Sequence, residues 1–420
     1  MSTLLSITQA ILNMGATALL PFIIMVLGMV FGMKFGRALK AGLFVGIGFT
    51  GLNLVVGLLT TTIQPISDYY ASMGKGFTTL DLGFAASGAA SWTVPFAPIA
   101  IPLIIIANFI LIFVFKRKVL NVDIWNYIHF LIPGALCYGL FGSAALGLIV
   151  TVVCAIVSLL VAEKIAPVWQ DYFGLDGTTC STFSFITFMY PLSWLVNKII
   201  DHIPGLKDLD ADMSALESKL GVFGEPCFVG FIVGAFLGII TKQPVPVIFQ
   251  TGIGIAAVLI LIPRMVTVMM EGISPLGTAA SEFMRKHLGE DAELWIGMDV
   301  ALGLGDPACV TCTAICIPIT IAFAFIIPNM TYFPIGVLTI VCYTTVFCVM
   351  ASDGNLIRSL ICSILSMFII VFCANLFVPE ATAFFNVTGL DIGNNMATDG
   401  FFGFNVANII ICLIHRLIGA

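Results

Sequence analysis

The chain has 420 residues, 60% of them hydrophobic and only 10% charged, and its mean hydropathy is +1.10. Soluble domains carry about 25% charged residues, so this chain has too few charges to cover a surface in water, and a soluble globular protein is excluded. The net charge of −6 says little about partners, because the placement of Lys and Arg in loops matters more than their sum in a membrane protein.

The long apolar runs predict the fold class, an all-α integral membrane protein. In hydrocarbon every backbone N–H and C=O needs an internal partner, which leaves helices or closed barrels, and the runs lack the alternation of barrel strands. A spanning helix needs about 20 mainly apolar residues. We predict about eleven transmembrane helices, at 8–33, 41–60, 95–115, 128–144, 145–162, 223–241, 246–263, 308–328, 334–350, 356–378 and 403–414.

Three further segments do not fit a simple span. Two shorter apolar stretches, 77–94 and 294–307, are interrupted by Gly and acidic residues, and we predict that they are two re-entrant hairpins or broken helices. Residues 181–200 are apolar enough to span but contain Pro191 and end in Asn-Lys, which favours an interfacial or half-inserted helix.

The chain contains an internal repeat in which 20–104 resembles 225–321. Chance similarity of apolar sequences is the alternative, but landmarks recur in the same order, which favours duplication. The landmark pairs are Pro21 and Pro226, Gly46-Ile47-Gly48 and Gly252-Ile253-Gly254, and Leu80-Asp81-Leu82 and Met298-Asp299-Val300.

Loop charges predict how the two copies are oriented. Basic residues at 34–40 and 116–118 place the loops after the first and third spans in the cytoplasm, and in the second copy the basic residues have moved to the opposite loops. This pattern indicates an inverted repeat, an architecture of carriers; a spanning 181–200 would instead make the repeat parallel. The predicted parts are 1–162, the first inverted repeat; 163–222, a cytoplasmic or interfacial connector; 223–378, the second inverted repeat; and 379–420, an external loop and the last helix.

Ionisable residues inside a membrane are functional candidates, because their burial is costly without a partner. Five acids lie in or beside the broken segments: Asp81, Asp176, Glu225, Asp299 and Asp306. Asp81 and Asp299 are repeat mates, which an inverted repeat would bring together near the middle of the bilayer. Capping of the hairpin helices is an equally strong interpretation of these two residues, and one residue can do both.

Three other residues near the predicted hairpins and spans have competing interpretations. Glu225 lies between a Gly and a Pro that break a helix, which favours a site residue over an ion pair with Lys219 or Lys242. His129 lies inside a predicted helix and is expected to point into the bundle, although a lone His is more often a satisfied core residue. Asp123 is adjacent to basic residues and is expected to be a surface cap.

The cysteines do not indicate a metal site. Cys309, Cys312 and Cys316 form the densest group, but no second pair of ligands completes a zinc site, so core packing is favoured. Walker, Rossmann and HExxH motifs are absent from the sequence. We therefore predict no metal and no cofactor.

Four motifs together resemble the galactitol-type enzyme IIC of the phosphotransferase system, in order and spacing from the first span to about residue 380. They are Asn121-Val122-Asp123-Ile124-Trp125-Asn126 with His129, Phe223-Gly224-Glu225-Pro226 with Val229-Gly230-Phe231, Ile262-Pro263-Arg264, and Gly297-Met298-Asp299.

The resemblance implies a multi-pass permease of the bacterial cytoplasmic (inner) membrane that transports a sugar alcohol, galactitol or a related polyol, and works with soluble IIA and IIB proteins. It also implies a fold similar to the ascorbate enzyme IIC, a homodimer with a scaffold domain and a core domain that moves as an elevator. A phosphocysteine on IIB would phosphorylate the polyol at the cytoplasmic face, so the phosphoryl-carrying residues lie on other chains and the permease is one part of a phosphotransferase complex.

The sequence departs from the galactitol carriers at Thr182 and Asp306, where those carriers commonly have histidines. With this resemblance, Glu225 or His129 is predicted to position the reacting hydroxyl, while Asp299 and Asp306 bind the remainder of the polyol. The predicted substrate-binding residues are Asp81, Trp92, Asp176, Ser181, Thr182, Glu225, Asp299 and Asp306. Trp92 would stack on a carbon face of the polyol or pack against lipid. The alternative function is an ion-coupled secondary transporter of a small polar solute that leaves its substrate unphosphorylated.

Overall fold

In the computed structural model the described residues are 16–73, 77–123, 125–206, 226–288, 293–390 and 392–419. They form helices and five short strands. The predicted site residue Glu225 lies outside the described residues, as do the start of the first predicted span and 207–222 of the predicted connector.

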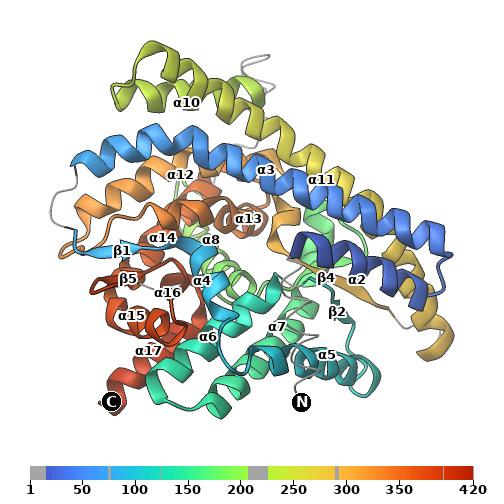
Figure 1. Cartoon of the computed structure of the whole chain (residues 1–420). Coiled ribbons are helices and arrows are strands. Elements are labelled where there is room, and N and C mark those ends of the chain that lie inside the picture. Colours follow the sequence, from blue (N-terminus) through green and yellow to red (C-terminus); the bar gives the residue numbers. More distant parts are fainter. Residues whose placement is uncertain are drawn as a thin grey trace.

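Two pairs of helices form one layer, which we call the long-helix layer (Figure 1). α2 (Ala16–Val30) precedes α3 (Phe35–Met73), and α10 (Pro226–Ile240) precedes α11 (Val245–Leu288). Glycines allow α3 and α11 to pack closely, Gly272 against Val45 and Gly254 against Thr62. This order of contacts makes the two long helices antiparallel, so α3 starts at the end of the molecule where α11 finishes.

The other elements form a second layer, which we call the core layer. Its long apolar helices are α5 (Ala97–Phe113), α6 (Asn126–Phe141), α7 (Ala144–Phe173), α12 (Pro307–Ile326) and α14 (Leu356–Leu376). Between them lie α4 (Gly83–Ser91), η1 (Phe185–Met189), α8 (Tyr190–Ile200), η3 (Val300–Gly305), η4 (Gly336–Ile340), α13 (Val341–Ala351), α15 (Val378–Val387), α16 (Phe401–Phe404) and α17 (Val406–Ile418).

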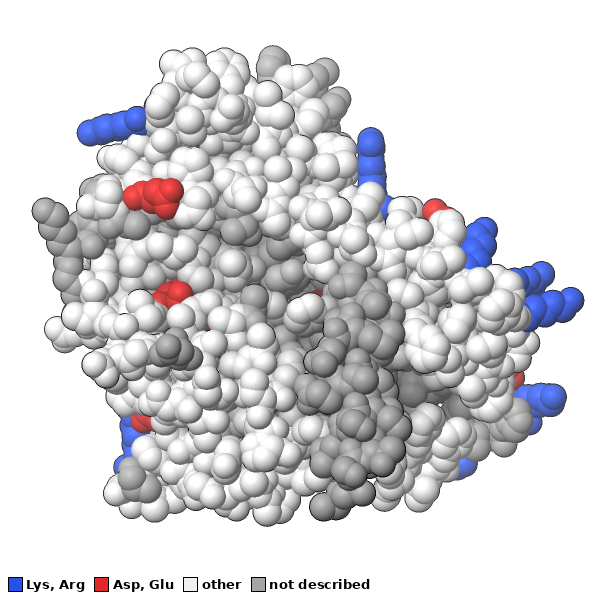
Figure 2. Space-filling model, in the orientation of Figure 1, with Lys and Arg blue, Asp and Glu red and all other residues white. Residues whose placement is uncertain are grey.

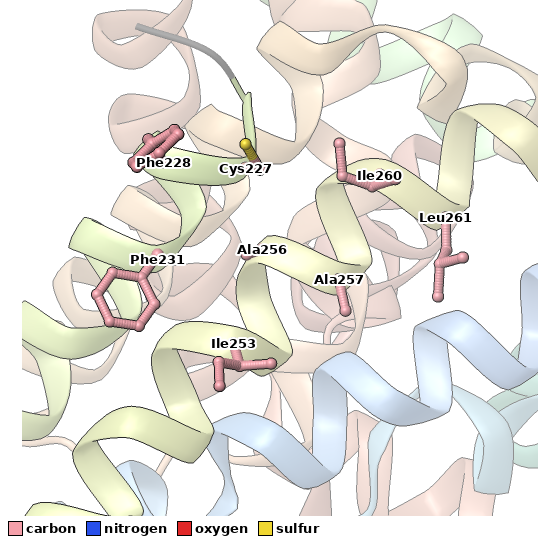
Figure 3. Close-up of a pocket in the computed structure, with 8 residues that line it drawn as sticks. All are labelled: Cys227, Phe228, Phe231, Ile253, Ala256, Ala257, Ile260 and Leu261. Carbon is pink, nitrogen blue, oxygen red and sulfur yellow. The ribbon is translucent and has the colours of Figure 1, made fainter. Parts of the chain in front are cut away.

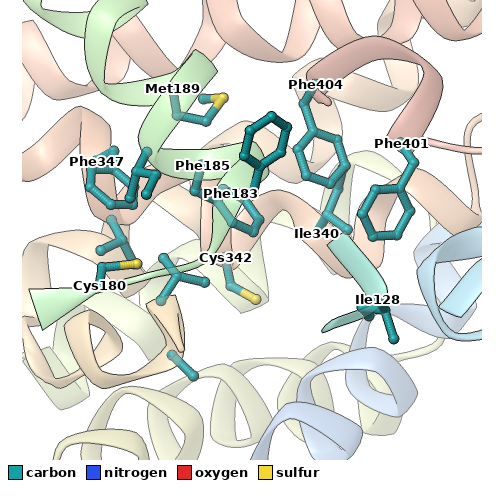
Figure 4. Close-up of a cluster of buried hydrophobic side chains, with 14 of the residues drawn as sticks. Ile128, Cys180, Phe183, Phe185, Met189, Ile340, Cys342, Phe347, Phe401 and Phe404 are labelled. Carbon is teal, nitrogen blue, oxygen red and sulfur yellow. The ribbon is translucent and has the colours of Figure 1, made fainter. Parts of the chain in front are cut away.

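Aromatic side chains join distant segments at the centre of the core layer (Figure 4). The ring centroid of Phe404 lies 5.1 Å from that of Phe185 and 5.0 Å from that of Phe401. All three side chains are almost completely buried. Lipid is as apolar as these rings, so close van der Waals packing of the cluster, and not exclusion of water, holds α16 against η1.

The five strands form two small parallel sheets. β1 (Thr79–Asp81) pairs with β5 (Met396–Thr398), and Thr79 also makes a parallel bridge to Tyr332. In the second sheet β4 (Trp295–Met298) lies between β2 (Val119–Asn121) and β3 (Thr178–Cys180).

Asparagine side chains satisfy backbone groups at the edges of these sheets. Asn108 of α5 donates to the carbonyl of Val119 at 2.8 Å and accepts the N–H of Asn121 at 2.9 Å. Asn375 of α14 accepts the N–H of Thr331 at 2.8 Å, beside the other sheet. Unpaired strand edges are not tolerated in hydrocarbon, so these asparagines allow short strands inside an apolar protein.

The two segments predicted to be re-entrant hairpins each contain a short strand. The predicted hairpin 77–94 consists of β1 followed by α4, and 294–307 consists of β4 followed by η3. Each segment is therefore a strand and a short helix within the core layer. Residues 185–200 form a continuous helical segment, η1 and α8, whose buried face includes Ser193 and Asn197, while the apolar side chains Trp194, Leu195 and Ile199 are exposed.

Several helices of the described chain can cross a membrane. By length and composition five qualify, Phe35–Val55, Ala144–Phe173, Val245–Ala280, Pro307–Ile326 and Leu356–Leu376, and six shorter apolar helices accompany them. Figure 2 shows few charges across the broad middle of one face, with most Lys and Arg gathered at the end where α2 meets α3. The integral membrane class is confirmed, and the count of eleven spans stays a prediction.

Candidate functional site

The candidate site forms where the strands β2, β3 and β4 end. Because the three strands are parallel, their carboxyl ends lie at one edge of the sheet. Asp123 follows β2, Thr182 follows β3 and Asp299 follows β4. Gly297 of the central strand lets the neighbours approach, since an added Cβ would lie 2.7 Å from Ser181 Oγ and 3.2 Å from Asn121 Cα.

Asn126, the first residue of α6, is the centre of a buried hydrogen-bond network at this edge. Its Nδ2 donates to Asn121 Oδ1 and to Ser181 Oγ, each at 2.9 Å. Its Oδ1 accepts the hydroxyl of Thr182 at 2.8 Å, and that hydroxyl also lies 3.3 Å from Asp299 Oδ2. The network therefore connects the ends of all three strands and orients Asp299.

A cavity of about 80 Å³ opens beside this network. Aromatic rings frame it: the centroid of Phe84 lies 6.4 Å from Trp125, 6.3 Å from His129 and 6.2 Å from Tyr343. Both layers contribute to its wall. The lining residues are Phe49 and Asn53 of α3, together with Phe84, Trp125, His129, Phe185, Asp299, Val300, Ala301 and Tyr343 of the core layer.

The predicted residues His129 and Asp299 both line the cavity. Asp299 accepts the N–H of Ala301 at 2.8 Å, so the predicted capping role is confirmed. His129 is almost completely buried, and its Nδ1 lies 2.8 Å from Ser184 Oγ. His129 is thus a core residue with a hydrogen-bonded side chain, and it also forms part of the cavity wall.

Three buried polar atoms at the end of β2 have no hydrogen-bond partner in the described part of the protein. They are Asn121 Nδ2, Asp123 Oδ2 and Trp125 Nε1. An unsatisfied buried donor or acceptor costs about 1–3 kcal/mol, so three such atoms within five residues indicate a place that a ligand completes. The expectation that Asp123 is a surface cap is half wrong: it caps the N–H of Trp125 at 2.9 Å, but it is fully buried.

Ser181 and Thr182 are fully buried behind the cavity wall, within the Asn126 network. Asp81 belongs to the other sheet, where its carboxylate accepts the N–H groups of Gly83 at 3.2 Å and Val337 at 2.9 Å. The helix that follows Asp81, α4, contributes Phe84 to the cavity wall.

The remaining predicted residues lie away from the cavity. Asp306 caps α12 through the N–H of Ala308 at 2.7 Å and accepts the hydroxyl of Tyr172 at 2.8 Å. Asp176 is exposed in the turn between α7 and β3, and Trp92 is half-buried at the end of α4. None of these three is among the residues that line the described cavity.

Sequence reasoning missed Asn53, Asn126 and Tyr343 as site residues. Asn126 and Asn53 each carried a signal, because an amide inside an apolar segment requires a partner. Tyr343 carried none, since it resembles the apolar residues around it.

Apolar membrane helices around a small cavity lined by aromatic and a few polar side chains are consistent with an integral membrane permease. Comparisons with known proteins extend this to a family: residues 10–406 match the family described as "PTS system sugar-specific permease component" (EIIC-GAT). The chain therefore belongs to the sugar-specific permease components of the phosphotransferase system (PTS). Such permeases are integral proteins of the inner membrane, so the predicted family and location are confirmed.

Two relatives in Escherichia coli (strain K12) illustrate the similarity. The chain is 33% identical over 369 residues to the "PTS system galactitol-specific EIIC component", covering 88% of this chain and 81% of that protein. It is 28% identical over 373 residues to a "Putative permease IIC component", covering 89% of this chain and 85% of that protein.

Proposed function

We propose that the chain is the IIC permease of a phosphoenolpyruvate-dependent PTS for galactitol or a related polyol, and that it works with soluble IIB and IIA proteins. The observation that carries this proposal is the set of unpaired buried atoms beside an aromatic cavity. Two of them are N–H donors, of Asn121 and Trp125, and one is a carboxylate oxygen, of Asp123. Of these residues Trp125 lines the cavity, so a polyol hydroxyl there can accept its indole N–H, while Asn121 and Asp123 lie near Trp125 along the chain, outside the described lining.

The walls of the cavity also suit a neutral polyol. No Lys or Arg is among the described residues that line it, so a sugar phosphate or another anion would lack a counter-charge. The C–H faces of a sugar alcohol can pack against Phe84 and Trp125. We propose that Asp299 accepts a substrate hydroxyl and that His129, with Glu225 from outside the described residues, positions the hydroxyl that is phosphorylated.

The position of the cavity supports an elevator motion. Phe49 and Asn53 reach it from α3, whereas its other lining residues belong to the core layer. We propose that the core layer carries the substrate along the long-helix layer, so that these two contacts are exchanged during transport. A phosphocysteine of IIB would then transfer its phosphoryl group at the cytoplasmic face, where positioning and a nearby base are the main requirements.

Matched backbone geometry supports the inverted repeat. The turn after α2 and the turn after α10 have the same three hydrogen bonds at the same spacing along the chain. The bonds are Phe31 N–H to Leu27, Gly32 N–H to Met29 and Met33 N–H to Gly28 in the first turn, and Thr241 N–H to Leu237, Lys242 N–H to Ile239 and Gln243 N–H to Gly238 in the second.

The sheets support the same symmetry, because the central strand of each comes from one half of the chain and its neighbours from the other half. We propose that β3 with η1–α8 corresponds to β5 with α16–α17. Each repeat would then extend beyond residues 162 and 378, and the connector would be shorter than 163–222.

A groove between α10 and α11 supports the proposed homodimer (Figure 3). It has a volume of about 520 Å³ and a wall that is almost wholly apolar. Small residues, Ala256 and Ala257, lie on the α11 side, and small residues let membrane helices approach closely. We propose that a second copy packs here. The lining residues are Cys227, Phe228, Phe231, Ile253, Ala256, Ala257, Ile260 and Leu261.

A substrate screen in membrane vesicles tests the proposed function. Vesicles that contain the permease are supplied with phosphorylated IIB and offered galactitol, other hexitols and pentitols. We expect one polyol to accumulate as its phosphate, and accumulation to require IIB. Uptake of an unmodified solute driven by a Na⁺ or H⁺ gradient, without IIB, would instead establish the ion-coupled alternative.

A further inference from the structure

Asp123 and Asp299 form a facing pair at the carboxyl edge of one sheet. β2 and β4 are parallel, with Asn121 opposite Gly297, and the ladder continues through the bond from Val122 N–H to the Gly297 carbonyl at 3.2 Å. Two residues beyond this register Asp123 stands opposite Asp299. Neighbouring strands are about 4.8 Å apart, and the two carboxyl groups are close enough to interact electrostatically.

The two carboxyl groups are bonded differently. Asp123 is fully buried; its carboxyl group faces the backbone N–H groups of Trp125, at 2.9 Å, and of Asp299, while its Oδ2 makes no hydrogen bond. Asp299 lines the cavity, and each of its oxygens faces a donor, Ala301 N–H at 2.8 Å and the Thr182 hydroxyl at 3.3 Å. Asp299 has a donor near each oxygen and borders the cavity, so it is better able to carry a negative charge than Asp123, which is enclosed and has one oxygen without a hydrogen bond.

No positive charge compensates the pair among the described residues. The ion pairs found there join Lys and Arg to Glu163, Glu293, Asp201 and Glu380 only. His129 lines the same cavity, but its ring is packed among Phe84, Phe185 and Phe401 and makes no ion pair with either carboxyl group. The other titratable groups near the pair, Cys180, Cys342 and Tyr343, carry no positive charge in any protonation state. Two adjacent buried carboxylates without a counter-charge do not both ionise.

We infer that the Asp123–Asp299 pair holds one proton, and that Asp123 is its protonated member. A proton on Oδ2 turns the unpartnered acceptor of Asp123 into a hydroxyl donor, which Asp299 accepts. The site then presents a single negative charge on Asp299 and an added O–H donor on Asp123. A neutral carboxyl group kept for hydrogen bonding is an established device in buried polar sites.

Infrared spectroscopy of the purified full-length protein in lipid nanodiscs tests this inference without substrate or IIB. A protonated carboxyl group absorbs in the carbonyl region separately from an ionised one. We expect Asp123→Asn to remove one carboxylic-acid band at neutral pH. The matched control is Asp353→Asn in an exposed turn, which should remove carboxylate absorption only. If Asp123→Asn also removes only carboxylate absorption, Asp123 is ionised and the inference is wrong.

A stability measurement separates this proton from a bound cation and from a loss of folding. Asn has the shape of a neutral carboxyl group and can donate, so Asp123→Asn should keep the melting temperature of the wild type, while Asp123→Ala should lower it. A melting temperature that rises in Na⁺ relative to choline, and only when Asp123 is present, would show a cation in place of the proton and would overturn the inference. Because neither readout uses transport, a wrong choice of substrate leaves both results valid.

Discussion

Among single residues, Gly297 shows how close backbone approach builds the polar network. It lies in the central strand between Asn121 and Ser181, and the space where its Cβ would stand is occupied by Ser181 Oγ at 2.7 Å. A side chain here must push β2 and β3 apart. The Asn126 bonds at 2.9 Å to both neighbours depend on that spacing.

We therefore expect Gly297→Ala to weaken substrate binding by about 10- to 100-fold, because overpacking of a tight site costs about 1–3 kcal/mol. The measurement is the Kd for the transported polyol by titration calorimetry. Gly57→Ala is the matched control, since no atom lies within 4 Å of an added Cβ in α3, and its Kd should not change. Equal Kd values for both variants would contradict the role given to Gly297.

The residues that could be predicted are those whose chemistry is out of place in an apolar chain. Asp299 and His129 stood out as ionisable groups within predicted membrane segments, and both line the cavity. Asp81 stood out equally, yet its carboxylate satisfies backbone N–H groups in the other sheet. An ionisable residue in an apolar segment is predicted to need hydrogen-bond partners. The sequence does not show whether the protein backbone or a substrate provides them.

At the scale of elements, an ion pair between buried Glu380 and exposed Arg416 fixes the last helix to the core layer. Arg416 of α17 donates to both oxygens of Glu380, at 2.6 and 2.9 Å, and to the carbonyl of Leu376 at 2.6 Å. The Glu380 side chain is only 4% exposed. Its charge is thus compensated by Arg416 of α17, and His415 Nδ1 of the same helix lies 3.9 Å from Glu380 Oε1.

Removal of one partner should destabilise the protein more than removal of both. Arg416→Met leaves the buried carboxylate of Glu380 with only His415 nearby, at 3.9 Å, and because Arg416 is itself 37% exposed we expect a cost of about 1–3 kcal/mol. Arg416→Met combined with Glu380→Leu should recover much of that loss, because an apolar pair needs no solvation. Melting temperatures of the three proteins in one detergent measure this. A double variant less stable than Arg416→Met would count against the explanation.

A second ion pair, between Asp201 after α8 and Arg358 of α14, predicts a pH dependence. The hydrogen bond from the Arg358 guanidinium, 2.7 Å long, lowers the pKa of Asp201 below its usual 3.8. The stability that this bond provides is therefore fully present above that pH and is lost as the pH falls through the lowered pKa. Because Asp201 is exposed, the effect is small.

Arg358→Gln should remove this acid-dependent component. Its melting temperature should fall less than that of the wild type between neutral pH and a pH of about 3. Asp201→Asn is the second variant, and it should show the same flattened profile. If the wild type and both variants lose stability in parallel, other carboxylates account for the acid response.

The long helices could be predicted from the sequence, and the short strands could not. Long apolar runs, such as those of α7 and α14, predict helices. Strands of three or four residues, such as β2 and β4, are too short for any periodicity to register. Their pairing joins residues 119–121 to 295–298, and no local pattern specifies such a distant partner. The candidate site was missed in part because it is built on these strands.

For the whole molecule, the antiparallel packing of α3 and α11 predicts which of their ends lie on the same side of the membrane. α3 and α11 are antiparallel, so the turn before α3 and the end of α11 lie together, while the turn before α11 lies at the far end. Lys34 and Arg285, which are both exposed, belong to the first end, and Lys242 belongs to the second. The positive-inside rule places the end that is richer in Lys and Arg in the cytoplasm.

Cysteine accessibility in intact cells tests this arrangement. In a variant without native cysteines, Lys34→Cys and Arg285→Cys should both resist a membrane-impermeant maleimide and react only after the cells are opened. Lys242→Cys should react from outside, because α10 and α11 turn at the opposite end. Labelling of Lys34→Cys and Arg285→Cys from different sides would contradict the antiparallel pair and, with it, the inverted repeat. Labelling of all three from one side would mean that α3 or α11 does not cross the bilayer.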